Sequence, residues 1–558
     1  MASPADPPRL IALDVLRGLA ILLMIFSGML PKTLPNWLDH GYQPHYRPDA
    51  SGAWVSTLMN GSPPFDARWK AFTWVDLVFP MFLFAMGAAI PLAMSRRLER
   101  DRSIGRALGS IAARAGMLVL FAVIVTQMTV SQLSWPQQDV KRVLVLIGFA
   151  AAFAFFVRTR RGARPRTTLA IRMGALLVIL GLIVACLIKG GGTFSWGESD
   201  VIILVLAHMY LIGAALWLFT RRWGWLRLVV IAPLLLLAHY LQFNPRQFGD
   251  WMWLGEWPTA LRPIASFPST LLNLPAWLPL GDGSAARLLN FAPLWNVTWL
   301  KFLWIVVPAT IVGDRVLAWS RGGKASVPPR AQRGRLVFAL SLAITASVCV
   351  GLRNYGFTTL ALGGPFRTPW PSLLLSLPLV AWLGAIILRA EPNVNAAFHR
   401  WLFTVGTAFL VIGLALACAP SGAAREGFFE GGISKGSPAT LSYYATSVGL
   451  CVLLLLGLTS VLDAPTTAPR RLRLIEANGQ NPMIAYYLAH AVLGAVLTLG
   501  VFTWIGQPLG AQVRSVEDLF AVPLRGWPWL YAIWGAIKTL MIAAFAWWLT
   551  KRRIVWRA

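Results

Sequence analysis

The sequence has 558 residues, 57% of them hydrophobic and only 13% charged, and its mean hydropathy is +0.61. This composition excludes a soluble globular domain, and the lack of period-two alternation argues against a β-barrel. The net charge of +28 would suggest nucleic acid in a soluble protein, but here the basic residues form short clusters between apolar runs. Basic clusters between apolar runs are typical of the cytoplasmic loops of helical membrane proteins. We therefore expect a polytopic all-α helix bundle whose partner is the lipid bilayer and not nucleic acid.

Apolar runs long enough to cross a bilayer recur along the whole chain. The predicted spans are 10–30, 74–94, 115–130, 143–157, 169–188, 201–219, 226–243, 299–317, 337–352, 373–388, 402–419, 442–461, 482–502 and 529–549. The basic clusters that follow them fall on one side of the membrane, which places both termini in the cytoplasm. We therefore predict about fourteen spans, and merging one weak pair would leave about twelve. The start lacks the pattern of a removable signal peptide, so the first run is expected to be retained.

Two long outside loops and one linker divide the predicted bundle. The loops cover 31–72 and 244–296, and the linker-like segment 320–335 contains Gly-Gly-Lys and Pro-Pro. We expect an N-terminal membrane bundle over 1–319, with the candidate catalytic loop 31–72, and a C-terminal bundle over 336–558. The four cysteines lie in apolar runs without metal-ligand spacing and are expected to be core residues.

Charged side chains inside predicted spans are candidate functional residues, because they are costly in hydrocarbon. Asp14 and Arg17 lie three residues apart and so share one helix face. Asp76 begins the second span, in the stretch 73–87 that also contains Pro80. The alternative for Asp76 is a purely structural N-cap of that helix.

Histidine is scarce, with six residues in the chain. His40 and His45 share the first outside loop with Asp39, Asp49 and Asp66, and a His oriented by a carboxylate is the usual general base. An ordinary surface loop is the alternative. His208, His239 and His490 lie in apolar runs and are more simply explained as hydrogen-bonded core residues, and His399 as a solvated one.

A phosphate site is predicted on the cytoplasmic side, at the segment 478–483 that opens the thirteenth span. Gln480 and Asn481 would lie at a helix start close to Arg470 and Arg471, and such an arrangement can hold phosphates. A plain Asn cap beside a basic topological signal explains the same residues. No nucleotide-binding loop, nucleophile elbow or zinc spacing is present, so we expect no metal.

Five segments resemble the transmembrane acetyltransferase family of heparan-α-glucosaminide N-acetyltransferase, and they run in family order. They are 13–20 with its Asp-x-x-Arg-Gly pattern, 73–87, 301–314, 430–443 and 479–483. The bacterial NagX-type (DUF5009) branch is the more similar one. The resemblance implies acetyl transfer from cytoplasmic acetyl-CoA to an amino sugar or glycan at the periplasmic side of a bacterial inner membrane.

The resemblance also implies a catalytic histidine in the first outside loop. In human-type members this histidine lies a few residues before the Thr that opens the second span, and the present sequence has Asp66 near that position. His45 is therefore the first candidate and His40 the second, with Asp66 or Asp76 orienting the ring. The residues expected to line the acceptor cavity or lock the spans together are Asp14, Arg17, Asp76, Glu430 and Lys435, and those expected to hold the donor are Asn481, Gln480, Arg470 and Arg471.

Two other functions remain open from the sequence. A transporter for amino sugars or sugar oligomers would explain buried charges and helices broken at Pro80 and Pro308, although no internal repeat supports it. An inert subunit of an envelope complex would explain the displaced histidine. The assembly state is open as well, with a homodimer as one alternative.

Overall fold

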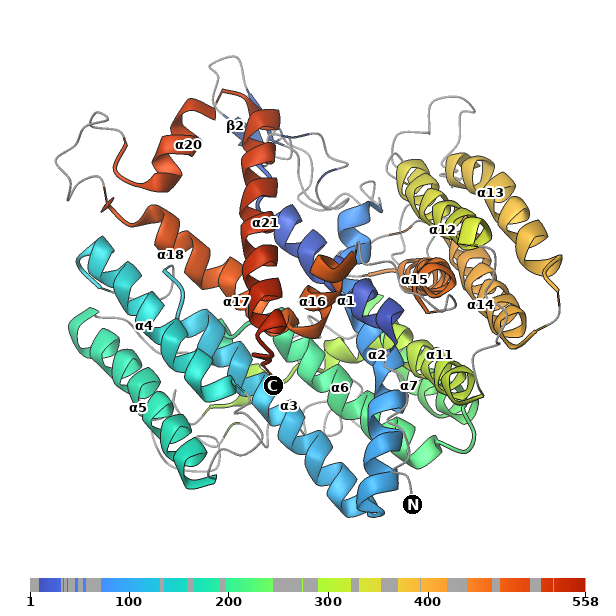
Figure 1. Ribbon diagram of the computed structural model, residues 1–558, viewed down its shortest axis with the longest axis horizontal. Coiled ribbons are helices and arrows are strands. Elements are labelled where there is room, and N and C mark those ends of the chain that lie inside the picture. The colour runs from blue at the N-terminus through green and yellow to red at the C-terminus, as the bar shows by residue number, and fades with distance from the viewer. Residues whose placement is uncertain are drawn as a thin grey trace. The chain divides into compact units, whose positions relative to one another are not determined.

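The computed structural model forms two compact units, each assembled from segments distant in the sequence (Figure 1). It describes residues 10–31, 34, 38, 46–48, 54–56, 72–130, 135–157, 165–190, 196–243, 273, 290–322, 331–352, 370–391, 393–418, 433, 435, 439–463, 472–501, 513–524 and 526–556. Unit 1 comprises Met1–Leu108, Ile212–Trp251 and Leu300–Gly479, and unit 2 comprises Gly109–Leu211, Met252–Trp299 and Gln480–Ala558. The division expected around 320–335 stays a prediction.

Unit 1 is built around one fully enclosed helix. Its helices are α1 (Ile11–Gly28), α2 (Trp74–Asp101), α7 (Leu226–Phe243), α11 (Leu303–Arg321), α12 (Ala331–Leu352), α13 (Trp370–Leu388), α14 (Val394–Ala417), α15 (Leu441–Leu462) and α16 (Arg473–Gln480). Helix α15 is buried along almost its whole length and contacts α1, α2, α11, α12 and α14. Its Ser, Thr and Tyr side chains and its glycines favour contacts with neighbouring helices over contact with lipid, which agrees with its central position.

Two glycines let α14 and α15 pack backbone against backbone. A Cβ on Gly413 would lie 2.5 Å from the amide nitrogen of Thr446, and one on Gly449 would lie 2.6 Å from that of Leu410. Small residues are the usual means by which membrane helices approach this closely, since apolar lipid gives no hydrophobic drive for association.

Unit 2 contains the remaining long helices and one irregular one. Its elements are α3 (Ile104–Gln127, which begins in unit 1), α4 (Gln138–Phe156), α5 (Pro165–Gly190), η2 (Trp196–Glu198), α6 (Val201–Thr220, which ends in unit 1), η5 (Ala292–Leu294), η6 (Val297–Phe302, which also ends in unit 1), α17 (Pro482–Tyr487), the π-helical turn η9 (Leu488–Val492), α18 (Leu493–Thr498), α20 (Val516–Leu524) and α21 (Pro528–Lys551). The predicted thirteenth span is therefore a helix with a π-turn in its middle, which is a rare feature often found near functional sites.

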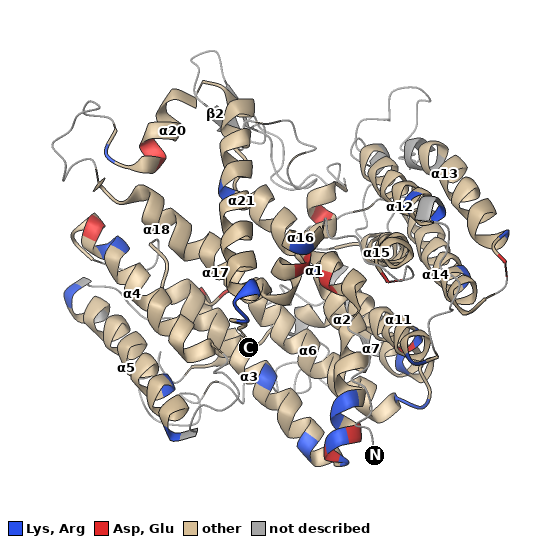
Figure 2. Ribbon diagram, viewed as in Figure 1, with Lys and Arg blue, Asp and Glu red and all other residues tan. Residues whose placement is uncertain are grey.

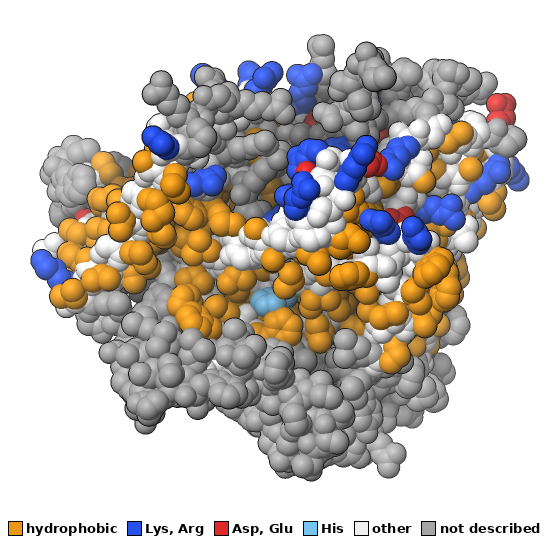
Figure 3. Space-filling model, turned by 90° about the horizontal axis from the view of Figure 1, so that it is seen from below, with side chains coloured by type: hydrophobic (Ala, Val, Ile, Leu, Met, Phe, Trp, Pro, Cys, Tyr) orange, Lys and Arg blue, Asp and Glu red, His pale blue; other side chains and the backbone are white. Residues whose placement is uncertain are grey.

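The helices confirm a membrane bundle. Among the described residues, ten helices are long and apolar enough to cross a membrane, and Leu374–Leu388 and Pro482–Thr498 are shorter apolar helices. Each of the predicted spans falls on a helix, while the exact count of fourteen stays a prediction. Figure 3 shows hydrophobic side chains spread widely over one face, with Lys and Arg beside them. Figure 2 shows Lys and Arg gathered at the C-terminal end of α2.

A small β-hairpin departs from the all-helical expectation. Strands β1 (Tyr46–Pro48) and β2 (Trp54–Ser56) pair antiparallel within the first predicted outside loop, with Tyr46 opposite Ser56 and Pro48 opposite Trp54. The hairpin begins directly after His45 in the sequence. This loop thus contains regular structure rather than a free run of chain.

Candidate functional site

The N-terminus of α2 is closed by a reciprocal capping box. Thr73 is the N-cap, and its backbone N–H donates to Asp76 Oδ2 at 3.0 Å while its hydroxyl donates to the same oxygen at 3.3 Å. Asp76 is fully buried. Asp76 thus supports the cap from the third helical position, and Thr73 rather than Asp76 is the N-cap.

Three of the motif segments meet at this end of α2. Tyr443 donates its phenolic O–H to the carbonyl of Asp76 at 3.0 Å, which joins the segment 430–443 to 73–87. Phe302 packs edge-on against Phe79 at 5.2 Å and against Tyr444 at 6.1 Å between ring centroids, which adds the segment 301–314. The N-terminal ends of α2, α11 and α15 are thus fixed together by aromatic packing and one buried hydrogen bond.

Glycines hold α2 against α11 further along. A Cβ on Gly87 would lie 2.9 Å from the carbonyl oxygen of Val306, and a Cβ on Gly313 would lie 2.4 Å from that of Ala88. Both helices run through their internal prolines, Pro80 in α2 and Pro308 in α11, without interruption. The broken helices expected for a transporter are therefore absent at these two positions.

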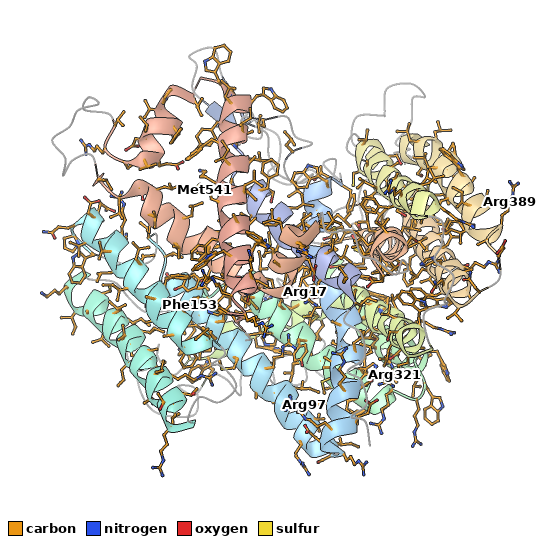
Figure 4. The ribbon with its side chains drawn as sticks, viewed as in Figure 1. Arg17, Arg97, Phe153, Arg321, Arg389 and Met541 are labelled. Atoms are coloured by element: carbon orange, nitrogen blue, oxygen red, sulfur yellow. The ribbon has the colours of Figure 1, made fainter. Side chains whose placement is uncertain are left out.

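Arg17 lies where α1 meets α2 and α16 (Figure 4), and Asp14 precedes it by three residues on α1. The carboxylate and guanidinium are 3.7 Å apart, and both side chains are largely buried. Arg17 also donates to the carbonyl of Gly479 at 3.3 Å and reaches that of Ala85 at 3.5 Å. One guanidinium thus joins the segments 13–20, 73–87 and 479–483, which lie far apart in the sequence.

Asp463 is a buried anchor that the sequence analysis missed. Its two carboxylate oxygens accept the backbone N–H groups of Ile11 at 3.0 Å and Ala12 at 2.8 Å. These are free donors at the start of α1, where the helix dipole also favours a negative charge. Leu10 precedes α1 and offers no side-chain cap, so a distant carboxylate supplies it.

A second missed feature is an ion pair between the buried Arg227 and the partly exposed Asp314, which joins α7 to α11. Arg227 has no exposed surface, and its Nη1 lies 2.6 Å from Asp314 Oδ2 and 3.2 Å from the Thr310 hydroxyl. The other oxygen of Asp314 accepts the indole N–H of Trp217 at 2.8 Å. Arg227 comes soon after the basic residues 221–222. From the sequence alone it is therefore grouped with the basic residues that mark the cytoplasmic side, and its burial is not expected.

Several predicted site residues lie outside the described residues. They are His40, His45, Asp66, Glu430, Arg470 and Arg471. Lys435 and Gln480 are described and half-buried. Among the described residues, no group of three or more His, Cys, Asp or Glu could hold a metal ion.

Asn481 lies in unit 2, where its side chain is already engaged. The amide nitrogen donates to the carbonyl of Ile554 at 2.8 Å and to the Thr550 hydroxyl at 3.0 Å, and the amide oxygen accepts the N–H of Trp556 at 2.9 Å. Asn481 therefore fixes the C-terminal end of the chain in this structure.

Histidines 208 and 490 have aromatic neighbours. The His208 ring lies 4.8 Å from that of Trp295 and 5.1 Å from that of Trp299. The His490 ring stacks on Tyr486 at 4.0 Å, and Tyr486 donates to Asp200 at 2.6 Å. His490 stands in the π-turn, and its Nδ1 lies 3.1 Å from the carbonyl oxygen of Tyr486, so it is hydrogen-bonded as expected but exposed rather than in the core.

Comparisons with known proteins confirm the resemblance seen in the motifs. Residues 9–253 match the family model described as "Domain of unknown function (DUF5009)". The heparan-alpha-glucosaminide N-acetyltransferase of Homo sapiens is 32% identical over 146 residues, which is 26% of this chain and 18% of the human protein. The enzyme of the same name from Mus musculus is 30% identical over 142 residues, or 25% and 18% of the two chains. The match thus covers less than a fifth of these relatives' length.

Proposed function

We propose that the chain is a transmembrane acetyltransferase that moves an acetyl group from cytoplasmic acetyl-CoA to an amino sugar at the periplasmic face of a bacterial inner membrane. The observation that carries the proposal is the convergence of motif segments on α2. Arg17, Tyr443 and Gly87 each join a distant segment to this helix. The similarity to two N-acetyltransferases supports the chemistry.

His45 is the proposed general base, with His40 as the second candidate. The acceptor amine nitrogen attacks the thioester carbonyl, its proton passes to the neutral imidazole, and the carbon–sulfur bond breaks as the coenzyme A thiolate leaves and is then protonated. Asp66 is proposed to orient the ring. In the alternative route the histidine is acetylated first and passes the group on.

Two further groups of residues are proposed to serve the acceptor sugar and the acetyl donor. Asp14, Arg17, Asp76, Glu430 and Lys435 are proposed for the acceptor side, either lining it or fixing the helices that do. For the donor, the proposed residues are Asn481, Gln480, Arg470 and Arg471. The hydrogen bonds of Asn481 to the C-terminal segment mean that its side chain has to exchange partners before it holds a ligand.

The test uses purified protein in detergent with radiolabelled acetyl-CoA and glucosamine. Wild type should transfer the label to the sugar, and His45→Ala or His40→Ala should lower the rate about 10²–10⁴-fold, the contribution usual for a general base. His399→Gln, on a helix that the account gives no catalytic role, is the matched control and should leave the rate unchanged. Transfer that survives in both loop variants would remove the histidine from the mechanism.

Direct transfer and transfer through an acetyl-histidine differ in whether label exchanges between acetyl-CoA and coenzyme A in the absence of the sugar. Label should pass between acetyl-CoA and free coenzyme A without any sugar only if an acetyl-histidine forms. Absence of both transfer and acetyl-CoA binding in the wild type would favour the transporter or the inert-subunit alternative.

A further inference from the structure

The chain beyond α21 folds back onto unit 2 and buries a tryptophan. After Lys551 the residues Arg552 and Arg553 turn the chain, and Trp556 is only 3% exposed. Trp556 pairs with Val157 in an isolated antiparallel bridge next to the end of α4. The C-terminal segment 552–556 is thus held by a few backbone contacts and one large side chain.

The side chain of Asn481 makes three hydrogen bonds to this region. Its amide nitrogen donates to Ile554 and Thr550, and its amide oxygen accepts the backbone N–H of Trp556. The amide of Asn481 therefore offers a donor and an acceptor side by side, close to the backbone of Trp556. A planar heterocycle with an acceptor next to an amino group presents the complementary edge.

Five aromatic rings surround the Trp556 indole, and we call this arrangement the Trp556 pocket. The ring centroids of Phe121, Phe149, Phe153, Phe156 and Tyr487 lie between 5.6 and 6.1 Å from that of Trp556. Figure 4 labels Phe153 on α4, one wall of the pocket. The rings come from α3, α4 and α17, so the pocket is built by the folded unit and not by the C-terminal segment itself.

The indole satisfies the shape of the pocket but not its polar groups. The indole N–H of Trp556 and the phenolic O–H of Tyr487 are both buried without a hydrogen-bond partner among the described residues. A buried donor left unpaired costs free energy. The Tyr487 hydroxyl belongs to the wall of the pocket, and a ring with an acceptor atom on its edge would pair with it, which the indole does not.

The backbone of the segment is strained as well. Arg553 has φ of 59°, in the left-handed region that non-glycine residues rarely adopt. Release of the segment would relieve this conformation and would free the Asn481 amide. The segment begins within the basic residues 551–553, which are expected to lie on the cytoplasmic side, where the donor of the proposed reaction is found.

We propose that the Trp556 pocket binds the adenine ring of the acetyl donor, and that the C-terminal segment 552–556 occupies it as an internal competitor when no donor is bound. This inference rests on the proposed acetyl-CoA-dependent function. Adenine stacks on aromatic faces as indole does, its ring nitrogens would accept from Tyr487 and the Asn481 amide nitrogen, and its amino group would donate to the Asn481 oxygen.

The test measures binding of coenzyme A, adenosine 3′,5′-bisphosphate and pantetheine to the full-length protein in detergent. Trp556→Ala should tighten the binding of the first two about tenfold or more, an effect of about 1.4 kcal/mol, and should not change that of pantetheine. Trp529→Ala, an exposed tryptophan near the opposite end of α21, is the matched control and should bind all three as wild type does. Adding Tyr487→Phe to Trp556→Ala should reverse part of the gain, because it removes the proposed donor.

A measurement on the wild type guards against misfolding of the variant. Coenzyme A should accelerate backbone hydrogen exchange in the peptide that contains 552–556, because the segment leaves the pocket. Unchanged or slower exchange, or unchanged or weaker affinity in Trp556→Ala, overturns the inference. If the wild type still transfers acetyl groups in that case, the proposed function survives, whereas loss of both transfer and coenzyme A binding removes the two together.

Discussion

Gly18 on α1 and Gly479 at the end of α16 lie against each other's helices with no room for a side chain. A Cβ on Gly18 would lie 1.9 Å from the carbonyl oxygen of Ile475, and a Cβ on Gly479 would lie 1.7 Å from that of Asp14. Two segments that lie far apart in the sequence thus pack backbone to backbone. Arg17 and Asp14, the charged pair of α1, are placed by this contact.

Gly18→Ala should prevent or weaken this packing. The added methyl group meets a backbone carbonyl that cannot move aside without shifting a helix, so we expect a loss of about 3 kcal/mol or more, at the upper end for overpacking. Thermal unfolding of the purified protein, with the yield of monodisperse material, measures the effect. Gly28→Ala in the same helix has open space around it and is the control. Equal behaviour of the two variants would contradict the close contact.

Asp463→Ala should destabilise unit 1 by removing the cap of α1. Two backbone N–H groups lose a charged acceptor in a buried place, which we expect to cost about 2–3 kcal/mol. Asp463→Asn keeps one acceptor oxygen and should lie between the alanine variant and wild type in melting temperature. Equal melting temperatures for wild type and both variants would mean that water or another group already accepts hydrogen bonds from these two N–H groups.

The Arg227–Asp314 pair should show strong coupling. Asp314→Leu leaves the buried Arg227 guanidinium without its partner, at an expected cost of about 3–5 kcal/mol, whereas Arg227→Met leaves the partly exposed Asp314 carboxylate and should cost less. The double variant should recover a large part of this loss, because no lone charge remains. A double-mutant cycle on unfolding in detergent measures the coupling, and additive losses would show that the two charges do not interact as described.

The Asp76→Asn variant tests whether Asp76 has a chemical role in addition to capping α2. The capping box predicts a loss of about 1 kcal/mol in stability, and Thr73→Val should produce a similar one. If Asp76 also orients the catalytic ring, Asp76→Asn should lower kcat well beyond the effect of Thr73→Val, with KM for acetyl-CoA unchanged. Equal kcat values in the two variants would leave Asp76 as a structural residue.

The helices could be predicted from the sequence because lipid leaves the backbone few choices. A run of about twenty apolar residues has to satisfy its backbone hydrogen bonds internally, so each predicted span lies on a helix. The hairpin after His45 gave no such signal, since its two strands have three residues each and no period. The π-turn at His490 was likewise invisible, because its sequence is as apolar as that of an ordinary helix.

The partners of the candidate site residues depended on contacts that no local pattern encodes. Asn481 stands at a helix start as predicted, yet its amide is used by Trp556, 75 residues further along. Asp463 caps a helix 451 residues earlier, and nothing in its neighbourhood indicates this. The pairing of Asp14 with Arg17 was predictable, since both residues lie on one turn of helix.

The most direct test of the proposed function is sidedness in sealed inside-out membrane vesicles. Glucosamine is trapped inside, which corresponds to the periplasmic side, and radiolabelled acetyl-CoA is added outside. The account predicts labelled N-acetylglucosamine in the lumen, at a rate that falls in His45→Ala or His40→Ala, with no entry of intact acetyl-CoA. Release of unmodified glucosamine from the vesicles without any acetylated product would contradict the acetyltransferase and support the transporter.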